Sequence, residues 1–290
     1  MDFRRIENIL IIAFFLLNTF LAYTLFGKNM LMTSLSQDNI NIEQELKANE
    51  INLTFDLSSE EGKEPFIAGK QQKLSTEGEN RPQAQRLKWD KDTGQLYGEF
   101  AHPIALKGLK QASDDPTRLP NEVLSPINKL LTEGSIEEGE SYRFLVYNRQ
   151  RKMIYYGQVG YDDRLITDST ARLIFHLNDQ NEIVSYEMSH IQKVQPQGQV
   201  RSLISSKKAV ENLYLYNEIP SKSSVVSAQL SYQQTLRVED IIVYKPVWAI
   251  VIRLDAHSLK TVYVDGINGT IIQNPSDLLP KGQGGDNRHD

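Results

Sequence analysis

Cysteine is absent from this 290-residue chain. Without cysteine there is no disulfide framework and no thiolate ligand for zinc or an iron–sulfur cluster. The excess of acidic over basic residues is also small, because the formal net charge is only -5 at pH 7. No basic patch with interleaved aromatic residues occurs, so we expect no nucleic-acid partner and no polybasic adhesion to lipids.

Sequence motifs of enzymes are missing as well. The chain contains no G-x-S-x-G elbow, Walker A loop, G-x-G-x-x-G turn or H-E-x-x-H motif. Of its five scattered histidines, His176 and His190 flank one expected hairpin, where a cross-strand surface pair is favoured over a ligand pair. The doublet Asp162-Asp163 and the stretch DKDTGQ at 90–95 are typical of surface turns. We therefore expect no catalytic residue, no metal ion and no cofactor.

One long hydrophobic run is present in a chain whose mean hydropathy is -0.43. From Ile9 to Phe26 no residue is charged, and at about 1.5 Å per residue this run can cross about 30 Å of hydrocarbon as a helix. No small-x-small site follows it, so a cleavable signal is disfavoured. Arg4 and Arg5 precede the run, which favours a cytoplasmic N-terminus and an extracellular remainder in a single-pass cell-membrane protein. The alternative is a buried helix of a soluble domain.

A polar residue, Asn18, occupies the middle of this run. At the bilayer centre a side-chain amide has no water partner and gains from a hydrogen bond to another helix. Residues at helical spacing place it on one stripe, composed of Ile11, Phe14, Asn18, Leu21 and Leu25. The stripe predicts a lateral interface with another membrane helix. The alternative is a simple anchor that tolerates Asn18 beside Thr19.

The region after the run has the pattern of an antiparallel sheet. Three stretches join two alternating apolar runs through a cluster of Asp, Asn and Gly, and they predict β-hairpins at 87–100, 174–188 and 262–273. Runs of β-branched and aromatic residues predict further strands at 142–148, 153–160, 224–232 and 241–255. The links between them are too short for many parallel crossovers.

Helices are expected in three places. The stretches 125–134 and 205–220 each begin with Ser, carry apolar residues at helical spacing and end at Gly or Pro. A short juxtamembrane helix is predicted within 38–51. The polar stretch 57–86 has scarcely any apolar periodicity and predicts a connector.

These elements predict an α+β fold, in which a single N-terminal transmembrane helix precedes an extracellular region dominated by antiparallel β-sheet with a few helices. A helix followed by hairpins occurs twice, which suggests two related units. The expected segments are a cytoplasmic N-terminus (1–8), the transmembrane helix (9–26), a juxtamembrane helix with polar connector (27–86), a first extracellular α+β unit (87–200), a second (201–273) and a disordered tail (274–290).

Two stretches resemble a known family. The opening MDFRRIENILIIAFFLLNTFLAYTLF and the late VYKPVWAIVI...TVYVDGINGTII are similar to YycI proteins of low-GC Gram-positive bacteria, and the resemblance covers roughly residues 1 to 273. The late stretch also resembles PepSY-type repeats, which places a PepSY-like unit at 201–273.

The resemblance implies regulation without catalysis. YycI-like proteins are extracytoplasmic regulators that act with YycH on the sensor histidine kinase WalK, which controls cell-wall metabolism, and their membrane helix is thought to contact the kinase. We therefore expect a WalK-type kinase and a YycH-like protein as partners. The alternative function is an anchored PepSY-like inhibitor or chaperone of a secreted enzyme. A cell-wall hydrolase is disfavoured by the absent motifs.

Overall fold

A computed structural model of the chain describes residues 11–21, 42–77, 81–112, 115–255 and 258–272. Contacts divide the chain into two compact units, Met1–Glu45 and Leu46–Asp290. In the first unit residues 11–21 are helical. Helix α2 (Ile42–Ala48) lies at the boundary, within the stretch 38–51 where the sequence predicts a short helix. The tail 274–290 and the cytoplasmic segment 1–8 lie outside the described residues.

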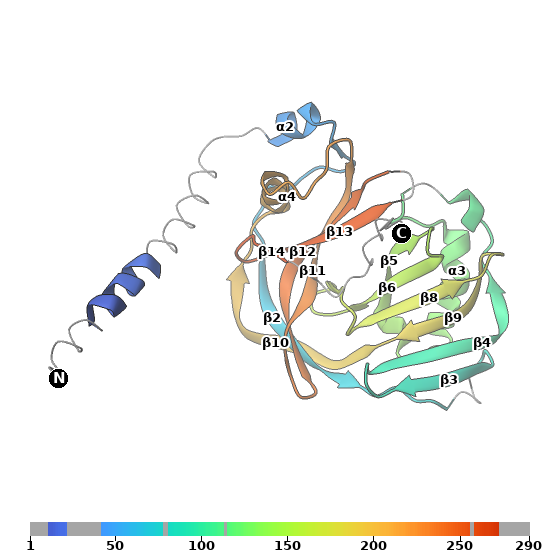
Figure 1. Cartoon of the computed structure of the whole chain (residues 1–290). Coiled ribbons are helices and arrows are strands. Elements are labelled where there is room, and N and C mark those ends of the chain that lie inside the picture. The colour runs from blue at the N-terminus through green and yellow to red at the C-terminus, as the bar shows by residue number, and fades with distance from the viewer. Residues whose placement is uncertain (1–10, 22–41, 78–80, 113–114, 256–257, 273–290) are drawn as a thin grey trace, which may run out of the picture. The chain divides into compact units, whose positions relative to one another are not determined.

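The second unit contains a 14-stranded sheet with two halves (Figure 1). Its N-terminal half is composed of β3 (Gln85–Asp90), β4 (Gln95–Ala105), β5 (Tyr142–Asn148), β6 (Met153–Val159), β8 (Arg172–Leu177) and β9 (Glu182–Met188). Its C-terminal half is composed of β1 (Asn52–Leu53), β2 (Lys63–Gln72), β10 (His190–Ser202), β11 (Ser224–Val238), β12 (Ile241–Arg253), β13 (Leu259–Asp265) and β14 (Ile271–Ile272). The short strand β7 (Leu165–Ile166) pairs with both β6 and β11 and joins the halves. Only the β1–β11 and β7–β11 pairs of this described sheet are parallel, so the predicted mainly antiparallel α+β fold is confirmed.

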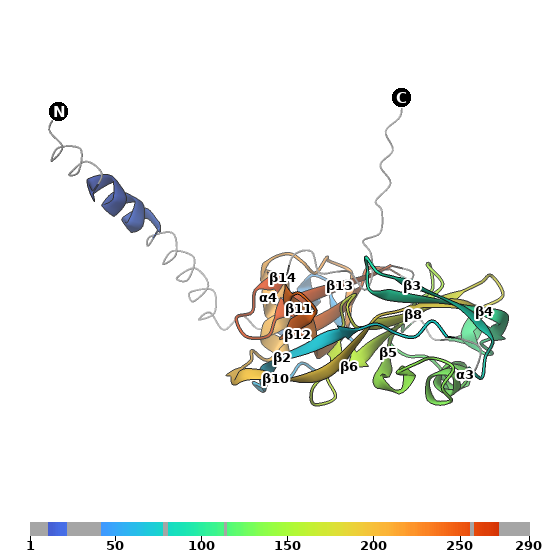
Figure 2. The same cartoon turned by 90° about the horizontal axis from the view of Figure 1, so that it is seen from below.

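Helix α3 (Asn121–Thr132) packs on one face of the N-terminal half, behind the strands in Figure 1 and below them in Figure 2. It buries Val123, Ile127, Leu130 and Leu131, which lie at helical spacing. The helix begins four residues before the predicted start, because the residues ahead of the Ser-Pro pair continue the apolar face through Val123. Two 3-10 turns, η1 (Leu109–Gln111) and η2 (Gly139–Ser141), flank this region.

Helix α4 (Ser206–Leu215) lies in the C-terminal half. The Ser205 hydroxyl accepts a hydrogen bond from the Lys208 N–H at 3.2 Å, which is an N-cap of the predicted kind. Asn212 donates from Nδ2 to the Gly269 carbonyl at 2.8 Å, which ties the helix to the β13–β14 turn. Tyr216, which the pattern places on the buried face, is exposed because the helix ends at Leu215.

Each of these helices is followed by a four-stranded antiparallel meander. After α3 the chain pairs β5, β6, β8 and β9 in sequence, and after α4 it pairs β11, β12, β13 and β14. The repeated order of helix and hairpins that the sequence predicts is therefore present in the structure.

All three predicted hairpins form. They are β3–β4, β8–β9 and β13–β14, and the clusters of Asp, Asn and Gly lie at their turns. Gly94 and Gly269 have φ of +66° and +73°, which glycine adopts without strain. Asp90 accepts the N–H groups of Asp92 and Thr93, and these bonds lower the pKa of its carboxyl. The stretch at 90–95 is therefore a hairpin turn, as predicted.

Two segment predictions are wrong. The stretch 57–86 is not only a connector, because β2 (Lys63–Gln72) lies inside it and pairs with both β10 and β12. Its apolar part is the short run PFIAG, and its other residues are polar although only Lys63 and Lys70 are exposed. The boundary at 200/201 also fails, because it falls inside β10, which pairs with β2.

The two halves of the sheet pack on each other through a shared apolar cluster. Val146, Tyr155 and Ile174 come from the N-terminal half, and Val247, Ala249 and Tyr263 come from the C-terminal half. Burying side chains of this size stabilises by about 1.5–3 kcal/mol each. The cluster fixes how the halves meet and therefore the walls of the cleft beside it.

Candidate functional site

The predicted interface stripe lies on the helix of residues 11–21. Ile11, Phe14, Asn18 and Leu21 are exposed in that helix, and Leu25 lies outside the described residues. Within the described part of the chain, no helix is both long enough and apolar enough to span a membrane.

Two side chains of this helix bond to their own backbone. Asn18 donates from Nδ2 to the Phe14 carbonyl at 2.8 Å, and Thr19 donates from Oγ1 to the Phe15 carbonyl at 2.8 Å. A carboxamide has two N–H donors and one carbonyl acceptor, so this bond uses one of the two donors. The Asn18 amide can therefore hold its rotamer and still bond to a neighbouring helix.

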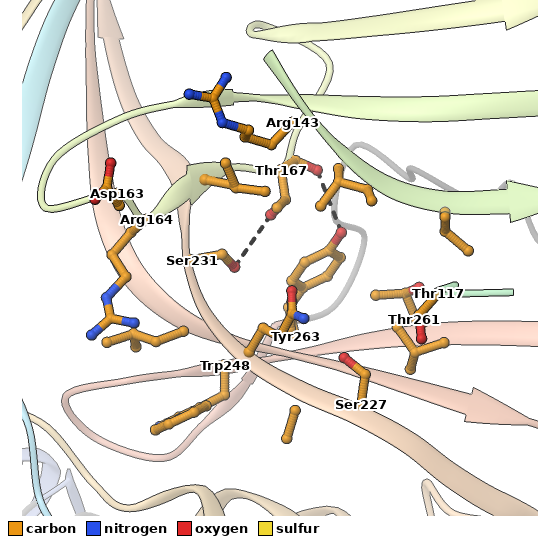
Figure 3. Close-up of a pocket in the computed structure, with 18 of the residues that line it drawn as sticks. Thr117, Arg143, Asp163, Arg164, Thr167, Ser227, Ser231, Trp248, Thr261 and Tyr263 are labelled. Carbon is orange, nitrogen blue, oxygen red and sulfur yellow. Dashed lines mark hydrogen bonds between the residues drawn. The ribbon is translucent and has the colours of Figure 1, made fainter. Parts of the chain in front are cut away.

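A cleft of about 710 Å³ lies between the two halves of the sheet (Figure 3). Parts of the chain that are far apart in sequence form its walls. They are the loop 58–62, Thr117, the strand segment 143–146 of β5, the segment 163–167 that contains β7, and the facing parts of β11, β12 and β13. A volume of this size is within the range of ligand sites, about 300–1,000 Å³.

Two hydrogen bonds of Thr167, drawn as dashed lines in Figure 3, lie at the cleft. Tyr263 on β13 donates its hydroxyl to the Thr167 carbonyl at 3.4 Å, and the Thr167 and Ser231 hydroxyls lie 3.4 Å apart. Trp248 donates from Nε1 to the Ile204 carbonyl at 2.9 Å. The first two bonds connect Thr167, directly after β7, to β13 and β11, and the third joins β12 to the segment before α4.

An ion pair between a buried carboxylate and a half-exposed arginine lies at one end of the cleft. Glu64 on β2 is 4% exposed, and its Oε1 lies 3.4 Å from Nε of Arg164. Tyr232 donates its hydroxyl to Oε2 of Glu64 at 3.3 Å. Burial, and then the negative charge of Glu64, raise the pKa of Tyr232. Arg164 is therefore committed to Glu64 while part of its side chain faces the cleft.

A second buried carboxylate lies beneath the joining strand. Asp168 accepts the Thr170 N–H at 2.8 Å and the Gln234 N–H at 2.6 Å. The Thr170 hydroxyl also bonds to Asp168 and lies 2.8 Å from the Tyr244 hydroxyl. Burial raises the pKa of the Asp168 carboxyl. This network fixes the β7–β8 connection to β11 and β12.

The two histidines that the sequence brings near one hairpin have separate partners. His176 Nε2 lies 3.9 Å from Oε1 of Glu187, and His190 Nδ1 lies 3.2 Å from the buried Tyr142 hydroxyl. Burial lowers the pKa of both imidazoles. The predicted surface pair is wrong, because His190 is buried. Within the part of the chain that the structure describes, no group of three or more His, Asp or Glu residues could hold a metal ion.

No local pattern in the sequence predicts the cleft. Its residues Arg143, Arg164, Trp248 and Tyr263 belong to four different strands or turns, and no motif links them. The aromatic content of these strands is the one local signal, but aromatic residues serve sheet packing equally well.

The comparisons with known proteins give one family. The family model described as YycI protein matches residues 30–267. No curated protein matches the chain.

Three solved structures are similar to parts of the chain. An uncharacterised protein from Eubacterium rectale is 10% identical, with 77% of this chain and 89% of that chain covered and a TM-score of 0.39. YycH from Bacillus subtilis is 14% identical, with 67% of this chain and 42% of that chain covered and a TM-score of 0.39. The C-terminal domain of YpeB from Bacillus megaterium is 11% identical, with 80% of this chain and 96% of that chain covered and a TM-score of 0.36.

Proposed function

Because this chain belongs to the YycI family, we propose that it is a membrane-anchored extracytoplasmic regulator of a WalK-type sensor histidine kinase that controls cell-wall metabolism. The observation that carries the proposal is the match of the family model to residues 30–267. Proteins of this family are regulators and are not known as enzymes. Its action therefore consists of contacts with other proteins, and a YycH-like protein is the expected second partner.

The anchor in this proposal is the apolar run from Ile9 to Phe26. Its lack of charge and its length support a single membrane-spanning helix. Arg4 and Arg5 support a cytoplasmic N-terminus, which leaves the sheet outside the cell. The kinase is then reached laterally within the membrane.

The stripe of Ile11, Phe14, Asn18, Leu21 and Leu25 is the proposed contact with the kinase. Packing of apolar side chains and hydrogen bonds between helices drive association in a bilayer, and each such hydrogen bond is worth about 0.6–2 kcal/mol. Asn18 retains one N–H donor and its carbonyl acceptor after bonding to Phe14. A polar group on the kinase helix would satisfy them.

The mechanism is a population shift. A partner helix changes kinase output only if it binds the two signalling states with different affinity. One interhelical hydrogen bond made in one state alone changes the equilibrium by about 3- to 30-fold. A complete switch needs about 10⁴-fold, so the rest of the stripe or the extracellular region has to contribute.

The test is a kinase-dependent transcription reporter in cells with Asn18→Leu in place of the native chain. We expect normal membrane levels, because leucine favours insertion, together with a reporter change of up to about 30-fold. Thr19→Leu is the matched control, because Thr19 lies beside Asn18 but off the stripe. Equal reporter output for Asn18→Leu and the native chain would remove Asn18 from the mechanism.

A further inference from the structure

Strand β11 has one edge that is only partly paired. β1 pairs with Ser224 and Val225, and β7 pairs with Ser231 and Tyr232, both in the parallel sense. Thr54, which follows β1, also donates to the Val226 carbonyl at 3.3 Å. Among the described residues no strand pairs with 227–230 on this side. The gap is about 13 Å long at 3.3 Å per residue, which is room for a strand of about four residues.

The cleft runs along this edge. Successive residues of a strand point to opposite faces of the sheet. All residues from 227 to 231 line the cleft, including Ser227 and Ser231 on one face and Leu230 on the other. A cavity lined by both faces of one strand has to pass around its edge, so backbone groups of 227–230 are accessible from the cleft. Unpaired strand edges bind extended polypeptide through main-chain hydrogen bonds.

The charged side chains around the cleft determine which charge a bound peptide should carry. Glu60 and Glu61 lie in the loop before β2, and Asp163 lies in the β6–β7 turn; all three are exposed and line the cleft. Within the described part of the chain none of the three has an ion-pair partner. Of the two arginines of the cleft, Arg164 pairs with Glu64, whereas Arg143 donates to the neutral carbonyls of Glu140 and Tyr142 and keeps its charge. Three exposed carboxylates against the single charge of Arg143 leave a net negative charge, which complements a cationic ligand.

From the unpaired edge and these charges we infer that the cleft binds an extended, basic peptide segment of a partner protein, which adds to β11 as a strand between β1 and β7. The segment carries Lys or Arg beside Glu60, Glu61 and Asp163, and it has no proline in its central residues, because proline lacks the N–H that the edge pairing uses. The site is separate from the helix stripe. Its test does not involve the kinase, so either proposal can fail without the other.

The probe is the fluorescent peptide acetyl-Lys-Thr-Val-Lys-Val-Thr-Lys-amide, titrated against the full-length protein in detergent micelles. Two matched peptides test the role of charge and the role of main-chain hydrogen bonds separately. One has Glu in place of each Lys, and the other keeps Lys but has its three central backbone nitrogens methylated. We expect the basic peptide to bind at least about tenfold more tightly than the acidic one, and the methylated peptide not to bind.

The protein variant is Glu60→Gln with Glu61→Gln, which neutralises two exposed carboxylates without touching the core. We expect it to weaken the basic peptide by about threefold to tenfold at low salt. The control pair, Glu122→Gln with Glu239→Gln, neutralises exposed carboxylates outside the cleft and should leave affinity unchanged. Equal weakening by both pairs would reduce the effect to net charge and overturn the assignment.

Hydrogen–deuterium exchange locates the bound peptide without any substitution. We expect the peptide to slow exchange in fragments that contain 227–230. Protection elsewhere, equal binding of the methylated peptide, or no saturable binding of the basic peptide would overturn the proposal. Exchange at 227–230 could also be slow in the protein without peptide and become fast on dilution. That result would mean that a second copy of this chain pairs with the edge, and it would overturn the proposal too.

Discussion

Removal of the Gln158 side chain should destabilise the second unit strongly. Gln158 lies on β6 in the N-terminal half, and its side chain bonds twice to Ile191 on β10 in the C-terminal half. Nε2 donates to the Ile191 carbonyl at 2.6 Å, and Oε1 accepts the Ile191 N–H at 2.9 Å. The amide thus satisfies a buried peptide group as a neighbouring strand would.

The magnitude follows from the two groups left behind. In Gln158→Ala the N–H and C=O of Ile191 lose their partners at a site where both residues are almost fully buried. Each orphaned buried group costs about 1–3 kcal/mol, so unfolding should become easier by about 2–6 kcal/mol. For a unit of this size 1 kcal/mol lowers Tm by about 2–4 °C, and the expected decrease in Tm is about 4–24 °C.

The assay is thermal unfolding of the full-length protein in detergent, followed by tryptophan fluorescence. Trp89 lies on β3 and Trp248 on β12, so both halves of the sheet are monitored. Gln180→Ala, which truncates an exposed glutamine in the β8–β9 turn, is the control and should shift Tm by less than about 2 °C. A shift of the same small size for Gln158→Ala would refute the reasoning, because it would mean that water replaces both bonds.

Three further predictions concern stability. Burial lowers the pKa of His190 below its ordinary 6.5, so the folded state binds fewer protons than the unfolded state. The free energy of unfolding should therefore fall as the pH decreases below about 6.5. His190→Gln should make this pH dependence weaker in urea titrations at several pH values. Gly98→Ala would place a Cβ 2.3 Å from the ring of the buried Tyr186, and we expect it to lower the free energy of unfolding in urea by about 1–3 kcal/mol. Gly62→Ala is the control and should change it little, because the atom nearest to the new Cβ is 3.7 Å away. Ser205→Ala removes the cap of α4 and should cost about 0.5–2 kcal/mol in the same assay, with helix loss visible by circular dichroism; no change would show that water caps the helix equally well.

Local signals predicted most of the second unit. The hairpins β3–β4, β8–β9 and β13–β14 are identified by turn residues within a few positions of each other, and α4 by its cap and its apolar spacing. These features depend on φ/ψ preferences and on side-chain periodicity, which a short window of sequence contains.

Non-local pairing explains what the sequence did not predict. β2 has only a short apolar run, and its place between β10 and β12 depends on residues more than a hundred positions away. β10 contains Pro196 and Gly198 and has two register shifts, which suit an edge strand but weaken a strand pattern. Strand preference is a property of the surroundings as much as of the residue.

The two candidate sites, the helix stripe and the cleft, also differ in whether local sequence signals predict them. The stripe through Phe14, Asn18 and Leu21 follows from helical spacing alone, and those three residues do lie on one helix. The cleft depends on two halves of a sheet meeting face to face, which no local pattern describes. The unpaired edge at 227–230 is visible only once the registers of β1 and β7 are known.

The central claim is that the N-terminal helix recognises the kinase. The most direct measurement is co-purification of the full-length protein with the WalK-type kinase from membranes, beside a variant in which residues 6–26 are replaced by an unrelated spanning helix. We expect the kinase to be recovered with the native chain and lost with the replaced helix, at equal membrane levels of both. Equal recovery of the kinase with both proteins, or recovery with neither, would contradict the account.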